Sequence, residues 1–402
     1  MDITFWVFRT KNSDVHMKQA LQLAFKNIIG AGLRTWLNVM VLAFAFVVII
    51  FYNAFLNGWY NQAEQDGIEW EYGYGQLQHA DYDPYDPFTL LDGHGVLKKE
   101  EQKGLTPLLI RQASIYPDGR MVSILLKGIP ADQNLLKLPT ESLKKSDADI
   151  PAIIGKRMAA STNLEIGDQV LLRWRDGNGT FDASEVTVTG IFDTTVPNVD
   201  NGQIWVDIDK LWEMSGLYGH ASLFIAAKGY APENPSPDWT FQDQDVLLKD
   251  IRAMVQIERI SSYFIYGILL FIALLAIFDT QVLSVFRRQK EIGTLISLGM
   301  TRTRVAAIFT FEGSMYSILA VLVGGILGLG LFIPTAKNGI SMPKGTDDMG
   351  FAMASTIYPA YSPQLILGTV LLLVSLATLV SFLPARKIAK MNPVDALKGK
   401  LQ

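Results

Sequence analysis

Charged residues cluster in one stretch, 279–312, which lies between two long apolar runs. Its middle holds a single acid, Glu291, and the stretch is rich in bases: Arg287, Arg288, Lys290, Arg302 and Arg304. Short loops between membrane helices that carry an excess of lysine and arginine are cytosolic. We therefore expect a soluble partner to bind this loop.

Two acids flank the loop at or near membrane depth, Asp279 and Glu312. An ionisable group in a membrane costs free energy unless it is paired, so both are candidates for a functional role. Because both lie near the cytosolic edge, we favour ion pairs with Arg287, Arg302 or Arg304. A proton or ion path is the alternative.

A second group of possible ligands lies nearer the N-terminus, and its members are His79, Asp81, Asp83, Asp86, Asp92 and His94. Clustered carboxylates suit calcium, but the ordered spacing and the turn glycine of a calcium loop are missing. Pro84 and Pro87 indicate a surface turn instead. The chain has no cysteine, which excludes a thiolate metal site, a cysteine nucleophile and a disulfide. We expect no bound metal.

Nothing in the sequence predicts a nucleotide site. A phosphate-binding loop needs the pattern Gly-x-x-x-x-Gly-Lys-Ser/Thr. The dipeptide Gly155-Lys156 lacks both the first glycine and the hydroxyl residue. No Ser-His-Asp order or pair of acids supports a catalytic site either. We expect a chain that is not itself an enzyme and that holds no cofactor.

The composition is that of a membrane protein. The 402 residues are 49% apolar and 18% charged, whereas soluble domains are about 25% charged. The net charge of -4 and the lack of a long basic block give no support for a nucleic-acid partner. Since roughly 20 apolar residues cross a bilayer, the sequence predicts four spans, at 36–56, 260–283, 305–333 and 364–384.

These spans define the predicted organisation. Residues 1–35 form a cytosolic, interfacial amphipathic helix, residues 57–259 a large extracytoplasmic domain, and residues 334–363 a second outer loop. The loop 284–304 and the tail 385–402 are cytosolic. The predicted fold is therefore membrane α-helical, with four transmembrane helices and a large mixed α/β extracytoplasmic domain inserted between the first and the second.

Within the large domain, short apolar alternations bounded by turn residues predict strands, and periodic stretches predict helices. The strands are expected at 122–126, 169–174, 185–192 and 203–206, and the helices at 155–161 and 209–214. Apolar residues at helical spacing in 246–260 predict a stalk helix that pairs with the continuation of the first span near 59–63.

Gly324 and Gly328 stand four residues apart in the third predicted span. Small residues at this spacing permit membrane helices to approach closely. We expect a helix contact on this face of the span, without a particular partner.

Three cytosolic motifs stand at a recognisable spacing. The central one is an Arg-x-x-Glu-Ile-Gly run, then Leu-Gly and a basic pair: Arg288, Glu291, Ile292, Gly293, Leu298, Gly299, Arg302 and Arg304, with the acid Glu312 following. The others are Ala24, Asn27, Arg34, Thr35 and Leu37, and Pro384, Ala385, Arg386, Asn392, Pro393, Ala396 and Leu397. In these motifs the chain resembles the MacB/FtsX-like permeases of ABC transporters, including the lipoprotein-releasing permeases of the LolC and LolE type. Ser297 and Asp279 depart from the pattern.

The resemblance implies a coupling helix in the central loop. Residues 291–298 can form two helical turns, and Gly299 can end them in the left-handed conformation. The residues implied to couple to an ATPase are Arg288, Glu291, Ile292, Gly293, Leu298, Gly299 and Arg302. ATP and magnesium would then be held by the partner ATPase.

The resemblance also implies a function. The chain would be a permease subunit in the cytoplasmic (inner) membrane, with both termini in the cytosol, and would couple ATP hydrolysis by ABC ATPase subunits to extrusion or release of a lipoprotein, lipid or other amphipathic substrate. A second permease copy or paralogue, a periplasmic carrier or adaptor and membrane lipid are the other implied partners. The alternatives are an FtsX-like mechanotransmission subunit that controls a periplasmic cell-wall hydrolase, and an extracytoplasmic sensor.

Overall fold

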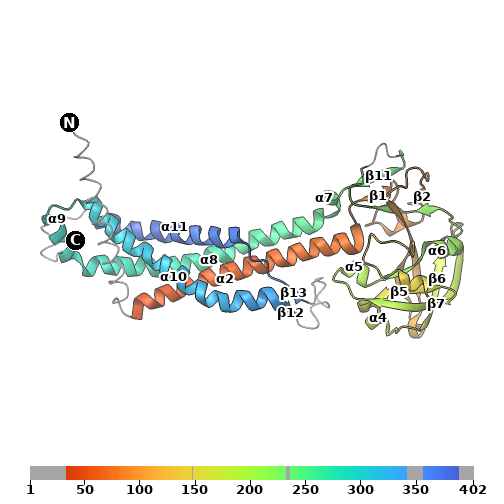
Figure 1. The fold of residues 1–402 in the computed structure, drawn as a ribbon, viewed down its shortest axis with the longest axis horizontal. Coiled ribbons are helices and arrows are strands. Elements are labelled where there is room, and N and C mark those ends of the chain that lie inside the picture. The colour runs from red at the N-terminus through yellow and green to blue at the C-terminus, as the bar shows by residue number, and fades with distance from the viewer. Residues whose placement is uncertain (1–32, 147, 232–235, 342–355, 389–402) are drawn as a thin grey trace. The chain divides into compact units, whose positions relative to one another are not determined.

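The computed structural model describes residues 33–146, 148–231, 236–341 and 356–388. They fold into two compact units, which we describe separately (Figure 1). The helical unit contains the chain up to Gly58, Ile257–Ile340 and the chain from Tyr358, and the sheet unit contains Trp59–Gln256 and Ser341–Ile357. The predicted amphipathic helix at 1–35 and most of the predicted tail at 385–402 lie outside the described residues.

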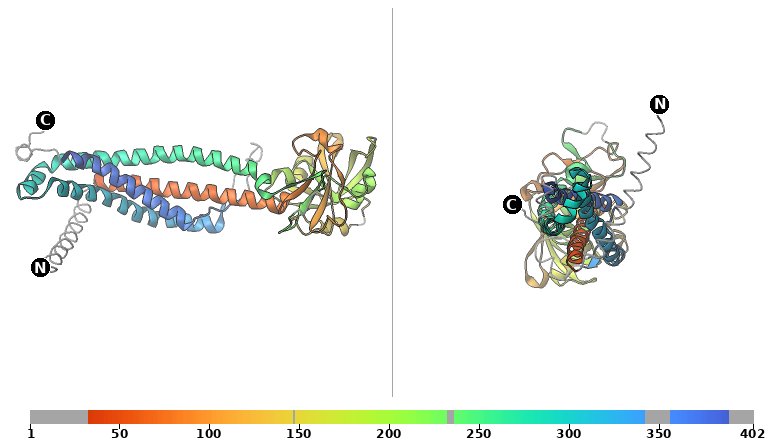
Figure 2. Two further views of the ribbon diagram at one scale, coloured as in Figure 1. Left: turned by 90° about the horizontal axis from the view of Figure 1, so that it is seen from above. Right: turned by 90° about the vertical axis from the view of Figure 1, so that its left-hand side faces the viewer.

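Four long helices supply the helical unit, and two of them also contribute residues to the sheet unit. They are α2 Leu33–Gly67, α8 Lys249–Arg287, α10 Arg302–Asn338 and α11 Pro363–Ile388. All four are long and apolar enough to cross a membrane. In the helical unit they run side by side (Figure 2). The prediction of a membrane protein with four spans is therefore confirmed.

Small and aliphatic side chains join the four helices. The shared core contains Leu42 and Phe46 of α2, Ala273 and Ile277 of α8, Met315 and Ala320 of α10, and Leu373 and Ala377 of α11. Lipid tails are as apolar as such a core, so close packing and hydrogen bonds, rather than the hydrophobic effect, hold membrane helices together. One such bond joins α2 to α8, because Asn38 Nδ2 donates to the carbonyl oxygen of Ala276 at 3.2 Å.

Glycines mark the closest helix contacts. A Cβ on Gly324 would lie 2.9 Å from Phe46 Cδ1 and 3.1 Å from the carbonyl oxygen of Ala43, both on α2. A Cβ on Gly328 would instead meet Phe332 of its own helix, at 2.6 Å. Gly324 therefore lies in close contact with α2, whereas the role of the two glycines as a packing pair stays a prediction.

Another close approach between helices of this unit involves a glycine that the sequence pattern did not single out. A Cβ on Gly313 of α10 would lie 2.3 Å from Ser381 Oγ of α11 and 3.0 Å from Gln281 Nε2 of α8. Any larger residue at this position would therefore force three helices apart.

We predict that Gly324→Leu lowers the thermal stability of the protein in detergent, because the side chain would overlap Phe46 and Ala43. Overpacking of this kind typically costs about 1–3 kcal/mol. Gly325→Leu is the matched control, since a Cβ at Gly325 would meet nothing within 4 Å. Equal melting temperatures for the two variants would contradict the close approach of α10 to α2.

The sheet unit is built on one mixed nine-stranded sheet with the order β11-β1-β10-β3-β4-β8-β5-β7-β6. Because β3 also pairs with β6, six of the strands close into a barrel, β3-β4-β8-β5-β7-β6. The strands are β1 Gln76–His79, β3 Leu105–Ile115, β4 Val122–Ile129, β5 Pro151–Gly155, β6 Gln169–Arg175, β7 Phe181–Phe192, β8 Gln203–Asp207, β10 Leu223–Ala226 and β11 Trp239–Gln242. The predicted strands at 122–126, 169–174, 185–192 and 203–206 lie within β4, β6, β7 and β8.

Short elements connect these strands. The helices are α3 Glu141–Lys144, α4 Lys156–Thr162, α5 Pro197–Asp200, α6 Ile208–Ser215 and α7 Gln244–Leu247, with shorter turns η1 Ile68–Tyr72, η2 Pro87–Leu90 and η3 Pro117–Gly119. The predicted helices at 155–161 and 209–214 correspond to α4 and α6. Two-residue strands are β2 Gly95–Val96, β9 His220–Ala221, β12 Ile340–Ser341 and β13 Thr356–Ile357. The predicted mixed domain is thus confirmed, with strands predominating.

Alternate residues of the barrel strands face two different interiors, as the two-residue period of a strand requires. Ile124 and Leu126 of β4 pack inside the barrel with Ile204 of β8. Their neighbours Leu125 and Trp205 pack on the outer face. The register pairs Lys127 with Trp205, so Lys127 lies on that outer face as well.

An ion pair joins α2 to α8 inside the sheet unit. Arg252 Nε donates to Glu64 Oε1 at 2.8 Å, and Arg252 also pairs with Asp245 at 2.5 Å. The two helices therefore contact each other close to the predicted pairing near 59–63. The mechanical role of this stalk stays a prediction.

Candidate functional site

The loop between α8 and α10 contains one short helix, α9 Gln289–Ser297. It ends at Gly299, whose φ of 92° lies in the left-handed region. The Gly299 amide donates to the carbonyl of Ile296 at 3.0 Å, and the Met300 amide donates to that of Leu295 at 3.1 Å. These two bonds form the Schellman ending of a helix, which usually needs glycine at this position. The predicted helix at 291–298 is thus present, displaced by one to two residues.

One face of α9 is buried against the neighbouring helices. Ile292 is fully buried, and Gly293 and Gln289 are buried beside it. The small core around Ile292 contains Val285, Val305, Ala306, Phe309 and Ala385. Burying a side chain of this size stabilises a contact by about 1.5–3 kcal/mol. The helix is therefore packed tightly to α8, α10 and α11.

Arg288 binds two acids at once. Its Nε and Nη2 donate to the two carboxylate oxygens of Glu291 at 2.6 and 2.7 Å, and its Nη1 donates to Glu312 Oε2 at 2.7 Å. The guanidinium also lies 4.8 Å from the centroid of the Phe309 ring. Only the planar guanidinium fork can make such a bidentate contact together with a third bond. Arg288 therefore links the end of α8, the first turn of α9 and a position about three turns into α10.

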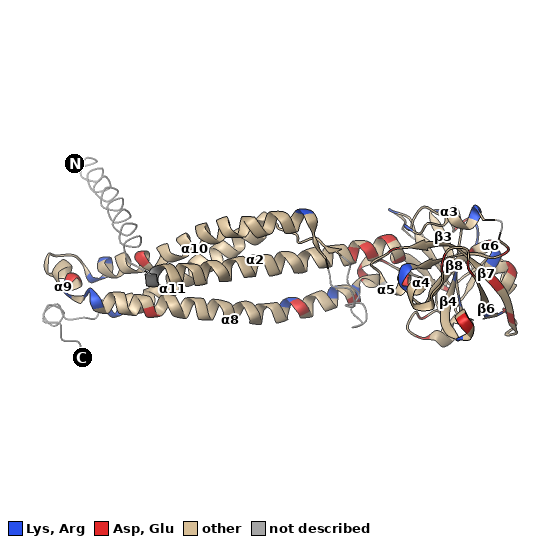
Figure 3. Ribbon diagram, turned by 90° about the horizontal axis from the view of Figure 1, so that it is seen from below, with Lys and Arg blue, Asp and Glu red and all other residues tan. Residues whose placement is uncertain are grey.

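This contact favours the charged form of the acid of α9. Hydrogen bonds from Arg288 hold the pKa of Glu291 below its usual range. Other charged residues of the helical unit also lie on α9 and the adjacent ends of α8 and α10 (Figure 3). Within the described residues, this part of the helical unit is where charge concentrates.

The two acids near membrane depth differ in their surroundings. Glu312 is buried, and its partner is Arg288, a residue that the sequence analysis assigned to the coupling surface and not to this acid. Asp279 is exposed on α8 and forms no ion pair with the described residues. The expected pairing of Asp279 with a neighbouring arginine is therefore not found.

The opposite face of α9 is exposed. Leu298 is 80% exposed at its C-terminal end. The exposed residues around it are Lys290, Glu291, Thr294, Gly299, Arg302 and Arg304. The residues predicted to couple thus divide into two groups. Arg288, Ile292 and Gly293 hold the helix in place, and Glu291, Leu298, Gly299 and Arg302 lie on the surface.

We predict that Glu312→Gln lowers the melting temperature of the protein by several degrees, because the guanidinium of Arg288 loses a buried carboxylate. Hydrogen bonds to charged groups contribute about 1.5–3 kcal/mol. Glu291→Gln is the matched control, since the Glu291 side chain is 50% exposed and surface pairs contribute only about 0–1 kcal/mol. A thermal unfolding series that ranks Glu291→Gln as the more damaging change would contradict this assignment.

Acidic side chains near the N-terminus of the sheet unit accept hydrogen bonds that stabilise turns. Asp83 Oδ1 accepts from the Tyr85 amide and Asp86 Oδ1 from the Phe88 amide, both at 2.9 Å. His94 packs against another ring, because its Nδ1 is 3.0 Å from Nδ1 of His220. The stretch therefore does not converge on one point.

Burial lowers the pKa of His94 to about 4, and the nearby charge of Arg111 and the ring of His220 add to this effect. An unfolded histidine takes up a proton below pH of about 6.5, whereas the folded one resists until about 4. His94 therefore destabilises the fold as the pH falls from about 6.5 to 4. We predict that this loss is smaller in His94→Gln, as measured by melting temperatures across that range. Parallel curves for the two proteins would count against a buried neutral histidine.

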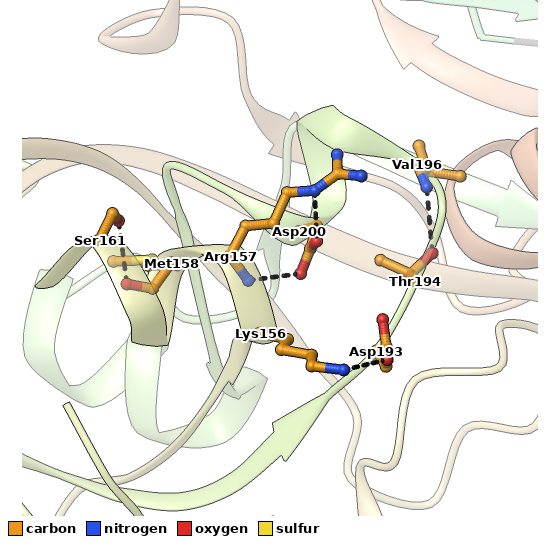
Figure 4. Close-up of polar contacts among 8 residues, drawn as sticks. All are labelled: Lys156, Arg157, Met158, Ser161, Asp193, Thr194, Val196 and Asp200. Carbon is orange, nitrogen blue, oxygen red and sulfur yellow. Dashed lines mark hydrogen bonds and ion pairs between the residues drawn. The ribbon is translucent and has the colours of Figure 1, made fainter. Parts of the chain in front are cut away.

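The dipeptide Gly155-Lys156 fastens α4 to a neighbouring loop (Figure 4). Lys156 Nζ binds Asp193 Oδ2 at 2.6 Å, and the Arg157 amide and Nε bind Asp200 at 3.1 and 3.2 Å. A Cβ on Gly155 would lie 2.2 Å from the carbonyl oxygen of Asp200, so only glycine fits. The motif therefore has a structural explanation in this unit.

Comparisons with known proteins agree on one group of relatives. Residues 263–393 match the family described as FtsX-like permease C-terminal. The chain is 28% identical to an uncharacterized ABC transporter permease of Methanocaldococcus jannaschii over 53% of the chain and 55% of that protein. It is 22% identical to the lipoprotein-releasing system transmembrane protein LolC of Neisseria meningitidis over 74% of the chain and 79% of that protein. A match at 25% identity to the macrolide export ATP-binding/permease protein MacB of Neisseria gonorrhoeae covers 44% of the chain and 26% of that protein.

Proposed function

Since the chain carries an FtsX-like permease domain and is a multi-pass ABC transporter permease of the FtsX, MacB and LolC type, we propose that α9 is the element through which a separate ATPase subunit moves the membrane helices. The proposal places the α9 loop in the cytosol and the sheet unit on the other side of the membrane. ATP and magnesium belong to the partner, and this chain supplies no catalytic residue.

The observation that carries this proposal is that Arg288 forms ion pairs with both Glu291 and Glu312. An element that transmits force must be rigidly attached to the helices that it moves. The Arg288 contacts and the buried Ile292 connect α9 to the ends of α8 and α10. A force applied to the surface of α9 would therefore move these helices together instead of deforming the loop.

The partner's contact surface is the exposed tip of α9. Leu298 offers one apolar side chain, and the exposed bases Lys290, Arg302 and Arg304 of the same loop add positive charge to its surface. Binding sites of this kind combine a central apolar anchor with a charged rim. We propose that Leu298 inserts into an apolar recess of the ATPase whose rim is acidic.

The proposed cargo is an amphipathic molecule, a lipoprotein or a lipid. The similarity to LolC proteins supports it, because that alignment spans both the helical and the sheet units and covers 79% of the relative. In the proposed cycle a second permease, either a copy of this chain or a paralogue, faces the first, and closure of the ATPase pair drives the cargo out of the membrane. A periplasmic carrier or adaptor would receive it.

We predict that Leu298→Asp weakens binding of the ATPase at least tenfold, because a buried carboxylate without a partner disfavours the interface. The protein would be purified with its ATPase from native membranes and reconstituted in liposomes that contain a fluorescent lipoprotein and a fluorescent lipid. The measurements are co-purification, stimulation of ATP hydrolysis and ATP-dependent release of each label. All three should fall together in the variant. Replacement of Glu291, or of Gly293 by a larger residue, should also uncouple the permease from its ATPase.

Ile166→Asp is the matched control, because Ile166 is an exposed aliphatic residue of the sheet unit, at 64% exposure. It should leave ATPase binding unchanged. Normal co-purification and stimulation with Leu298→Asp would overturn the docking role of α9. If the unmodified protein stimulates ATP hydrolysis normally but releases neither label, the coupling role of α9 would stand and the proposed cargo would be overturned. That result would favour mechanotransmission.

A further inference from the structure

The sheet unit contains a cavity of about 590 Å³, a size usual for a small-molecule site. Its floor is the outer face of the barrel strands, the side opposite the barrel core. Leu108 and Ile110 of β3, Leu125 of β4 and Leu223 of β10 line this floor. The cavity therefore offers an apolar surface formed by paired strands, which is a rigid base for a ligand.

One buried cation lies in this apolar wall. Lys127 of β4 is 5% exposed, and its ammonium lies 4.8 Å from the centroid of the Trp205 ring. Burial lowers the pKa of Lys127 to about 8, and Glu71 opposes that change. The ammonium is thus charged at neutral pH, although an aromatic face and the charge of Glu71 replace little of its lost hydration. Placing a lysine on the protein surface costs less free energy than burying it at this position. None of the contacts described for the barrel requires a lysine here.

Two further polar atoms beside the lysine lack partners. Among the described residues, neither Gln203 Oε1 nor Trp205 Nε1 has a hydrogen-bond partner. Both residues line the cavity and are buried, at 5% and 1% exposure. An unsatisfied buried donor or acceptor is unfavourable and uncommon in folded proteins. Here one acceptor and one donor occur on alternate positions of β8, and Trp205 is paired with the lysine.

The charges around the cavity are of both signs. Lys127 is the base, and Glu71 and Asp83 are acids that also line it. A ligand with only a negative group would meet two acids, and a ligand with only a positive group would meet the buried lysine. A ligand that carries both groups can place its carboxylate at Lys127 and its ammonium at Glu71. Trp205 Nε1 can then donate to the carboxylate, and Gln203 Oε1 can accept from the ammonium.

From the cavity, its buried ammonium, its facing carboxylate and the unpartnered amide and indole groups, we propose that the sheet unit binds a small zwitterion of the amino-acid class with an apolar side chain. The side chain lies against Leu108, Ile110 and Leu125. Glu71 belongs to η1, which follows α2 directly, and Val246 and Leu247 of α7, just before α8, line the same cavity. The bound molecule would therefore touch the segments that follow α2 and precede α8. This site does not depend on the proposed transport function.

Three fluorinated probes with the same ring test the proposal: 4-fluoro-L-phenylalanine, 3-(4-fluorophenyl)propionate and 4-fluorophenethylamine. Binding is measured from the ¹⁹F line widths of each probe with the full chain in lipid nanodiscs, and empty nanodiscs correct for partitioning into lipid. The zwitterion should bind about tenfold or more tightly than either singly charged probe. Absence of binding by the zwitterion, or tighter binding of either singly charged probe, would overturn the proposal.

Two variants assign the charges. Lys127→Met should remove the preference for the zwitterion over the amine, since the carboxylate loses its partner. Glu71→Gln should remove the preference over the propionate and leave the contribution of the carboxylate intact. Melting temperatures and size-exclusion profiles identify a variant that fails to fold, and Glu71→Gln, which keeps the shape of the side chain, then carries the test alone. An unchanged ranking of the probes in a folded variant would overturn the site.

Discussion

A partly buried guanidinium needs carboxylate partners, and this requirement determines the geometry of the α9 loop. Arg288 lies beside Phe309 in a largely apolar surrounding and is held by Glu291 and Glu312. Separating it from the buried Glu312 would leave a charge partly desolvated, which is far less favourable than keeping this pair together. The ends of α8 and α10 and the start of α9 are thereby kept in one arrangement. The exposed Leu298 and its basic neighbours can then act as a single rigid surface.

A different constraint organises the sheet unit. The long strand β3 pairs with β10 through its first residues and with β6 through its last, while β4 runs along its other side. One strand therefore belongs both to the closed barrel and to its open extension. Because side chains alternate between faces, the barrel core takes Leu109, and the outer face takes Leu108 and Ile110. The outer face is where the cavity and Lys127 lie, so the fold that closes the barrel also creates a second, more polar interior.

Several features were predictable from sequence because they depend on local patterns. Apolar length identified the four spans, and glycine at position 299 identified the end of α9, since only glycine adopts its φ without strain. Strands with regular alternation, such as β6, were also found. The strand β3 was not, because Pro107 and the polar pair Arg111 and Gln112 interrupt its apolar pattern. Arg111 is buried nevertheless, and it donates to the carbonyl of Leu90 at 2.9 Å.

The sequence by itself determined the class of protein, the number of spans and the helix in the charged loop, because hydropathy and turn chemistry act over a few neighbouring residues. Only the tertiary structure decided which arginine binds Glu312, that Asp279 has no ion-pair partner among the described residues, and that Gly313 provides the closest helix contact. It also decided that Lys127 and Trp205, 78 positions apart by their numbers, share one wall of a cavity. Such pairings depend on strand register and on the rotation of packed helices, which are set by contacts between distant segments.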